Sequence, residues 1–92
     1  KSVVLQIIRG MKSELDKYVI ARVREKRLEQ GVSQRGIAFT ISRSASFVGQ
    51  VESDRFTTKY TVHQLYLIAK DLGCSPAEFF PPLDDPRFES EE

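Results

Sequence analysis

The 92-residue sequence has little of what marks secreted or membrane proteins. It holds one cysteine, Cys74, so no disulfide can form within the chain. No apolar run approaches the roughly 18–20 residues that a membrane-spanning helix needs. The apolar stretch Val3–Ile8 is short and lacks the small-residue cleavage site of a signal peptide. These absences favour a reducing compartment, and we expect a cytoplasmic protein.

The groups that carry catalysis or hold metal ions are also missing. The sequence shows no nucleophile paired with a base, no carboxylate pair and no glycine-rich phosphate loop. The one histidine, His63, has no cysteine or second histidine at the spacing of metal ligands. We therefore expect no enzyme activity, no cofactor and no metal site.

The net charge of +1 hides an uneven distribution along the chain. Residues 1–59 hold 12 basic and 6 acidic side chains, a net charge of +6. Residues 60–92 hold 2 basic and 7 acidic side chains, a net charge of −5. A basic part beside an acidic tail is typical of a protein that docks one face on a polyanion, although a solvated surface of mixed charge also fits the pattern.

Apolar residues at helical spacing predict a first helix that ends before Gly31, because glycine commonly ends helices. The apolar positions are Leu15, Tyr18, Val19, Val23 and Leu28. Four basic residues on this helix fit either phosphate contact or plain solvation, and they are Arg22, Arg24, Lys26 and Arg27.

Two short helices follow, each opened by a serine. Ser33 caps a helix from residue 34 to about residue 40, and Ser44 caps a helix over residues 45–52. Short helices joined by a tight turn can cross at a large angle. Ala38 is small enough to let the second helix approach the first. Their apolar positions are Ile37, Ala38, Ile41, Val48 and Val51.

Two capping boxes open the last pair of helices. Thr61 with Gln64 begins a helix that Gly73 ends, and Ser75 with Glu78 begins a short helix that stops at two prolines. The longer helix carries an apolar stripe of Val62, Leu65, Ile68, Ala69 and Leu72. We expect four aromatic residues in the core or at its edge, and they are Tyr60, Tyr66, Phe79 and Phe80.

Five helices without a strand pattern between them predict an all-α domain over residues 13–82. Residues 1–12 form an N-terminal extension, in which residues 2–8 fit either a strand or a continuation of the first helix. Because a short exposed apolar strand can pair with a strand of another chain, Val3–Ile8 is a candidate dimer element. Residues 83–92 are acidic and broken by proline, which predicts a loose tail.

The outer face of residues 45–52 carries small or uncharged side chains that suit the major groove of DNA. Glutamine and serine can pair with base edges there, and apolar groups can meet the thymine methyl group. The segment Val32–Ala38, continuing to Val48–Glu52, resembles the helix-turn-helix of the phage-repressor family, also called Cro/CI-type or XRE-type. Residues 65–80 resemble the fourth and fifth helices of that family, so the resemblance covers about residues 15–81.

This resemblance implies a compact five-helix, lambda-repressor-like fold that binds double-stranded DNA as a homodimer and regulates transcription. The positions that match base-reading positions of the family are Ala45, Ser46 and Gln50, with Phe47 and Gly49 beside them on the groove side. The positions that match phosphate contacts are Gln34, Arg43, Ser44, Ser53, Arg55 and Lys59. Glu52 fits a groove residue, but the resemblance favours a structural role, in which it braces a neighbouring helix or backbone.

The sequence departs from the family pattern at a few positions. Ser42 stands where the family has a glycine, so the turn must hold a non-glycine residue in a less favoured conformation. Ala45 and Ser46 are short, which leaves Gln50 as the main reader of bases and gives DNA shape a larger part.

An alternative class is a protein-interaction module. An antitoxin or adaptor would use the same helices mainly to hold a partner protein. Phe47 on the outer face and Phe88 in the acidic tail favour this second class.

Overall fold

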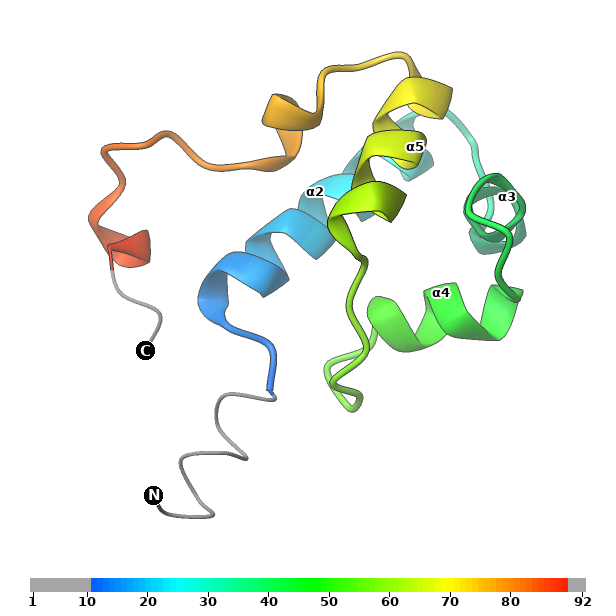
Figure 1. Ribbon diagram of the computed structural model, residues 1–92, viewed down its shortest axis with the longest axis horizontal. Helices are drawn as coiled ribbons and strands as arrows, with labels where there is room; N and C mark the ends of the chain where they lie inside the picture. Colours follow the sequence, from blue (N-terminus) through cyan, green and yellow to red (C-terminus); the bar gives the residue numbers. More distant parts are fainter. Residues whose placement is uncertain (1–10, 90–92) are drawn as a thin grey trace.

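The computed structural model describes residues 11–89, which form four α-helices and two short 3-10 helices and contain no strand (Figure 1). The elements are α2 (Glu14–Glu29), α3 (Gln34–Thr40), α4 (Ala45–Val51), α5 (Val62–Leu72), η1 (Pro76–Phe79) and η2 (Pro86–Phe88). The all-α prediction is confirmed for this part of the chain. The count of five helices is not confirmed, because the last capping box opens a 3-10 helix and not an α-helix. The candidate dimer element Val3–Ile8 lies outside the described residues.

Serine and threonine caps set where the helices begin. Each α-helix has a cap whose hydroxyl oxygen accepts from a backbone N–H of the first turn, and these caps are Ser13, Ser33, Ser44 and Thr61. Asp16 completes a capping box with Ser13, which the sequence analysis did not single out. Gly31 and Gly73 lie in the left-handed region after α2 and α5, where a side chain would be strained.

The core lies where α2, α3, α4 and α5 meet. Val23, Ile37 and Val48 are fully buried there, and Phe79 of η1 joins them. The C-terminal segment that the sequence predicted to be a loose tail also contacts the rest of the domain. The ring of Phe88 in η2 meets Tyr18 of α2 edge-on at 5.5 Å, so this part of the predicted loose tail packs on α2. Residues 90–92 lie outside the described part.

Four residues that were expected in the core or at its edge are exposed. They are Leu28, Val62, Tyr66 and Phe80, with 54%, 85%, 56% and 45% of their surface accessible. On α2, Val19, Val23 and Arg27 are four apart and share the buried face, so position 28 is rotated away from it. On α5 the buried face runs through Gln64 and Ile68.

The helical repeat explains the exposure of the two residues on α5. Val62 and Tyr66 are each two residues from Gln64, a rotation of about 200° at 3.6 residues per turn. That rotation places both on the opposite side of the helix from the core. Phe80 follows η1 in extended backbone, so it does not continue the 3-10 helix that buries Phe79.

The turn between α3 and α4 contains the one non-glycine residue with a positive φ among residues 11–89. Ser42 has a φ of 56°, as its place in a glycine position predicted. Its backbone N–H donates to the carbonyl oxygen of Phe39 at 3.2 Å. A left-handed conformation costs a non-glycine residue about 1–2 kcal/mol.

Ser42→Gly is therefore expected to raise the free energy of unfolding by about 0.5–1 kcal/mol, after the larger unfolded-state entropy of glycine is subtracted. Ser42→Ala is the matched control and should change little, because it keeps a β-carbon in the same conformation. Urea titration followed by circular dichroism measures both. A lower stability of the glycine variant would show that the turn is not strained.

Candidate nucleic-acid interface

Helices α3 and α4 cross at a large angle, since Figure 1 shows α3 nearly end-on while α4 lies across the view. The turn is fixed by the backbone N–H of Arg43, which donates to the carbonyl oxygen of Ala38 at 2.9 Å. Ala38 is buried, as expected of the small residue at the crossing, and Val48 and Val51 are fully buried on the inner side of α4. The outer side of α4 is thereby left free.

The predicted base-reading residues lie on α4 with different exposures. Ser46 is exposed, and Ala45, Gly49 and Gln50 are half-buried. The side-chain oxygen of Gln50 accepts from the hydroxyl of Thr58 at 3.3 Å, which holds its amide over the following loop. A β-carbon added at Gly49 would meet only the Gln34 side chain, at 3.6 Å, so this face is open.

Phe47 lies between an aromatic ring and a cation. Its ring centre is 6.4 Å from that of Tyr60, and the guanidinium carbon of Arg43 lies 3.9 Å from the Phe47 centroid. Phe47 is half-buried and packs against the core. Its ring therefore supports α4 and orients Arg43, while the guanidinium N–H groups of Arg43 remain at the exposed surface.

The predicted phosphate-contact residues divide into two groups. Arg43 and Arg55 are exposed and form no ion pair with any of residues 11–89. The other side chains already have partners inside the protein. Gln34 donates to Glu52 at 3.0 Å, Lys59 pairs with Asp16 at 2.9 Å, the hydroxyl of Ser44 accepts from the N–H of Phe47, and that of Ser53 accepts from the N–H of Arg55.

Sequence reasoning gave no role to two cations that the structure places at this site. Arg35, the second residue of α3, is exposed and forms no ion pair within the described part of the chain. Its place inside the segment that resembles a helix-turn-helix was the available signal. Lys12 reaches the C-terminal end of α4, and no local pattern indicated that contact.

The four basic residues of α2 that the sequence left open between phosphate contact and solvation all have acidic partners in the structure. Lys26 pairs with Glu78 at 2.9 Å, Arg22 pairs with Glu25, and Arg24 meets Glu52 at 3.5 Å. The remaining cation, Arg27, is buried.

The buried pair of Arg27 and Glu52 joins three helices. The guanidinium donates to both carboxylate oxygens, at 2.8 and 2.7 Å, and to the carbonyl oxygen of Val32 at 3.1 Å. Gln34 at the start of α3 donates to the same carboxylate. The side chains of Arg27 and Glu52 are 8% and 4% exposed. The bracing role expected of Glu52 is confirmed.

The electrostatics of this pair favour its charged form. Burial by itself raises the pKa of the Glu52 carboxyl, but hydrogen bonds from Arg27 and Gln34 together outweigh burial and lower that pKa. The hydrogen bond to Glu52 raises the pKa of Arg27. Burial also raises the pKa of Tyr60 strongly, and its hydroxyl has no hydrogen-bond partner among residues 11–89.

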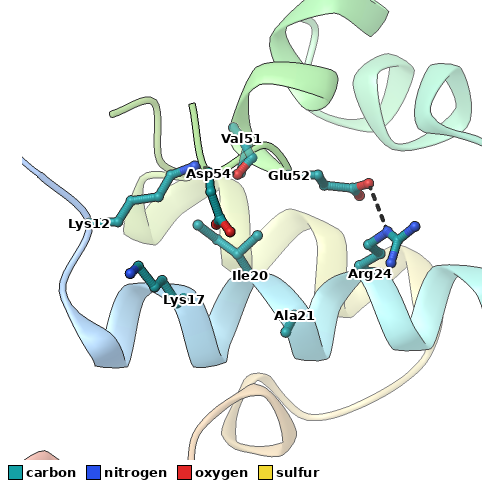
Figure 2. A pocket seen from close by; sticks show the side chains of 8 residues that line it. All are labelled: Lys12, Lys17, Ile20, Ala21, Arg24, Val51, Glu52 and Asp54. Carbon is teal, nitrogen blue, oxygen red and sulfur yellow. Dashed lines mark hydrogen bonds and ion pairs between the residues drawn. The ribbon is translucent and has the colours of Figure 1, made fainter. Parts of the chain in front are cut away.

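A hollow of about 170 Å³ lies between α2 and the C-terminal end of α4 (Figure 2). Charged side chains of both signs line it, and they are Lys12, Lys17, Arg24, Glu52 and Asp54. Arg24 already meets Glu52 across it. Residues 11–89 contain no cluster of side chains suited to a metal ion, and no helix in that range is long and apolar enough to cross a membrane.

Removal of the buried cation tests the bridge. Arg27→Met is expected to lower the free energy of unfolding at pH 7 by about 3–5 kcal/mol, because Glu52 is left as a buried charge without its main partner. Arg24→Met is the matched control. Arg24 meets the same carboxylate from a side chain that is 58% exposed, so its loss should cost less than about 1 kcal/mol.

The pH dependence gives a second readout of the same variants. In the wild type the pKa of Glu52 is lowered, so its contribution is complete above the unfolded value of about 4.3 and is lost as the pH falls through the folded value. Without Arg27, burial raises that pKa, and protonation at pH 4 relieves the penalty. The loss in Arg27→Met should thus be smaller at pH 4 than at pH 7. Equal losses at both pH values would contradict the bridge.

Comparisons with known proteins show the fold. No protein-family model matches the chain, and no curated protein matches its sequence. It is similar to HppE solved with Fe(II) and substrate, at 20% identity and a TM-score of 0.65, over 77% of this chain and 39% of that chain. HppE with Co(II) and substrate gives 19% identity and the same TM-score, over 78% and 39%.

The chain thus spans about 39% of the length of the HppE chains that it matches. It is also similar to NHTF, a hypothetical transcription factor from Neisseria, at 23% identity and a TM-score of 0.59. That match covers 79% of this chain and 88% of the NHTF chain. The chain therefore has a fold like that of a hypothetical transcription factor.

Proposed function

We propose that this chain binds double-stranded DNA through α3 and α4 and regulates transcription, as a protein of the phage-repressor (Cro/CI-type or XRE-type) kind. The observation that carries the proposal is the position of the unpaired cations. Arg35 on α3, Arg43 in the turn before α4 and Arg55 in the loop after α4 are exposed and have no ion-pair partner among residues 11–89. Salt bridges occupy most other basic side chains in this range, and these are Lys17, Arg22, Arg24, Lys26, Arg27, Lys59 and Arg87.

The free side of α4 suits the major groove. Ser46 and Gly49 add little bulk, so the helix backbone can lie close to base edges. Gln50 keeps its two amide N–H donors while its oxygen accepts from Thr58, and glutamine commonly pairs with adenine in the groove. Because few long side chains lie on this face, the phosphates and the shape of the DNA supply much of the binding energy and part of the specificity.

The assembly that we propose is a homodimer on two half-sites about one helical turn apart, as the resemblance to phage repressors implies. We also propose a binding rather than a catalytic role. The most buried charges of the described residues, Arg27 and Glu52, are paired with each other and hold helices together. That arrangement suits a structural brace better than proton transfer.

An antitoxin or adaptor remains the second candidate, and one observation favours it. Phe39 on α3 is 86% exposed, which suits a protein partner. The two aromatic residues that suggested this class from the sequence are engaged elsewhere, since Phe47 packs under Arg43 and Phe88 packs on Tyr18. These contacts therefore favour DNA binding over an antitoxin or adaptor role.

The salt dependence of binding tests the DNA proposal. A low-salt gel shift on mixed duplex DNA should show binding, and the affinity should fall steeply as salt rises, because each neutralised phosphate releases counterions. Arg43→Ala should weaken all sequences alike and make the log–log salt slope shallower by about 1. Lys70→Ala, on the exposed side of α5, is the control and should leave the affinity and the salt slope unchanged. No shift at low salt would favour the adaptor.

The base-reading role of Gln50 is tested on a site selected from random duplexes. Gln50→Ala should relax the preference at one base pair by about 1–3 kcal/mol and leave the other positions as they are. Thr58→Val is a matched variant that keeps the glutamine but removes the hydroxyl that holds it, so it should relax the same base pair more weakly. A uniform loss over all sequences in Gln50→Ala would show that Gln50 does not read bases.

A further inference from the structure

Lys12 lies just before Ser13, the cap of α2, and its side chain reaches the C-terminal end of α4. The ammonium nitrogen donates to the carbonyl oxygens of Val51 and Ser53, both at 2.7 Å, and to that of Gln50 at 3.4 Å. Figure 2 shows this side chain crossing from the start of α2 to the chain beside Val51 and Asp54. The contact joins residues 38 to 41 positions apart.

The end of α4 needs such a cation. The last carbonyl groups of a helix have no partner within the helix, and they carry a partial negative charge. Helix α4 has seven residues and no basic residue in its last turn. A helix this short is unstable alone, so its direction depends on contacts with the rest of the domain. Lys12 supplies from another element the charge that α4 lacks.

Two carbonyl oxygens at 2.7 Å and a third at 3.4 Å lie within reach of the three N–H donors of the ammonium group. Lys12 is also partly buried, and burial lowers its pKa while the carboxylates of Asp54 and Asp16 act in the opposite direction. Its donors are therefore not available to a DNA phosphate in this arrangement. That distinguishes Lys12 from Arg35, Arg43 and Arg55.

We propose that Lys12 is a positioning residue for DNA recognition, which fixes the C-terminal end of α4 against the start of α2 so that Gln50 meets base edges in one register. This inference rests on the proposed DNA-binding function. Arg27, near the C-terminal end of α2, holds the Glu52 carboxylate, and Lys12, just before the start of α2, holds the neighbouring backbone carbonyl groups. With one anchor removed, α4 stays packed but its direction is less constrained.

The experiment compares Lys12→Met with Lys17→Met in the full chain. Lys17 is a nearby exposed lysine that pairs with Glu14 at 3.6 Å, so its variant controls for the loss of a positive charge. Two duplexes are used, the selected site and the same site with the base pair read by Gln50 changed. Affinities are measured for both over a range of salt concentrations, at a temperature where circular dichroism shows each variant to be folded.

The wild type should bind the selected site more tightly than the changed site. We expect Lys12→Met to reduce this ratio of affinities by about tenfold, which lies within the discrimination that one base contact provides. The salt slope should stay that of the wild type, because no phosphate contact is lost. Lys17→Met should keep the wild-type ratio. A merely structural role would lower the folded fraction and leave the ratio of the two affinities unchanged.

Other outcomes overturn the proposal. An unchanged ratio in folded Lys12→Met shows that Lys12 does not position α4, and an equal loss on both duplexes with a shallower salt slope shows a phosphate contact instead. If Lys12→Met does not fold, Lys12→Arg is measured instead, because it keeps the charge and the N–H donors. A ratio of the two affinities near that of the wild type then supports the proposal. A ratio about tenfold narrower contradicts it. If the wild type binds neither duplex at low salt, the proposed function fails and this inference fails with it.

Discussion

The arrangement of the short helices depends on one buried ion pair, between Arg27 of α2 and Glu52 at the end of α4. Burying two charges is costly unless their hydrogen bonds are satisfied, and here the backbone of Val32 and the side chain of Gln34 complete the set. The pair therefore ties α2, the start of α3 and the end of α4 to one point.

The same pairing shapes the surface charge. Residues 1–59 carry most of the basic side chains, yet those of α2 are turned toward carboxylates within the protein. Three exposed arginines without an ion pair among residues 11–89, Arg35, Arg43 and Arg55, come from α3, the turn and the loop after α4. Lys70 on α5 is also exposed and has no ion pair in that range. The proposal that α4 meets a polyanion depends on the three arginines that precede or follow this helix along the chain.

Local features of the fold could be predicted from the sequence, and distant contacts could not. A serine cap such as Ser44 acts within three residues, and the positive φ of Ser42 follows from its place in a turn, so both are readable locally. The partner of Glu52 is 25 residues away, and the acceptors of Lys12 are about 40 away. No spacing rule links such positions. Of the candidate site, the helix, its free face and the bracing role of Glu52 were predictable, while the partner of Glu52 and the contact from Lys12 were not.

The proposal that α3 and α4 form the face that meets DNA can be tested by an amide chemical-shift map recorded while a duplex is added to the labelled protein. We expect the largest changes at the start of α3, along the outer side of α4 and in the loop through Arg55. Changes confined to the exposed side of α5 around Tyr66, or to Phe39 alone, would contradict it.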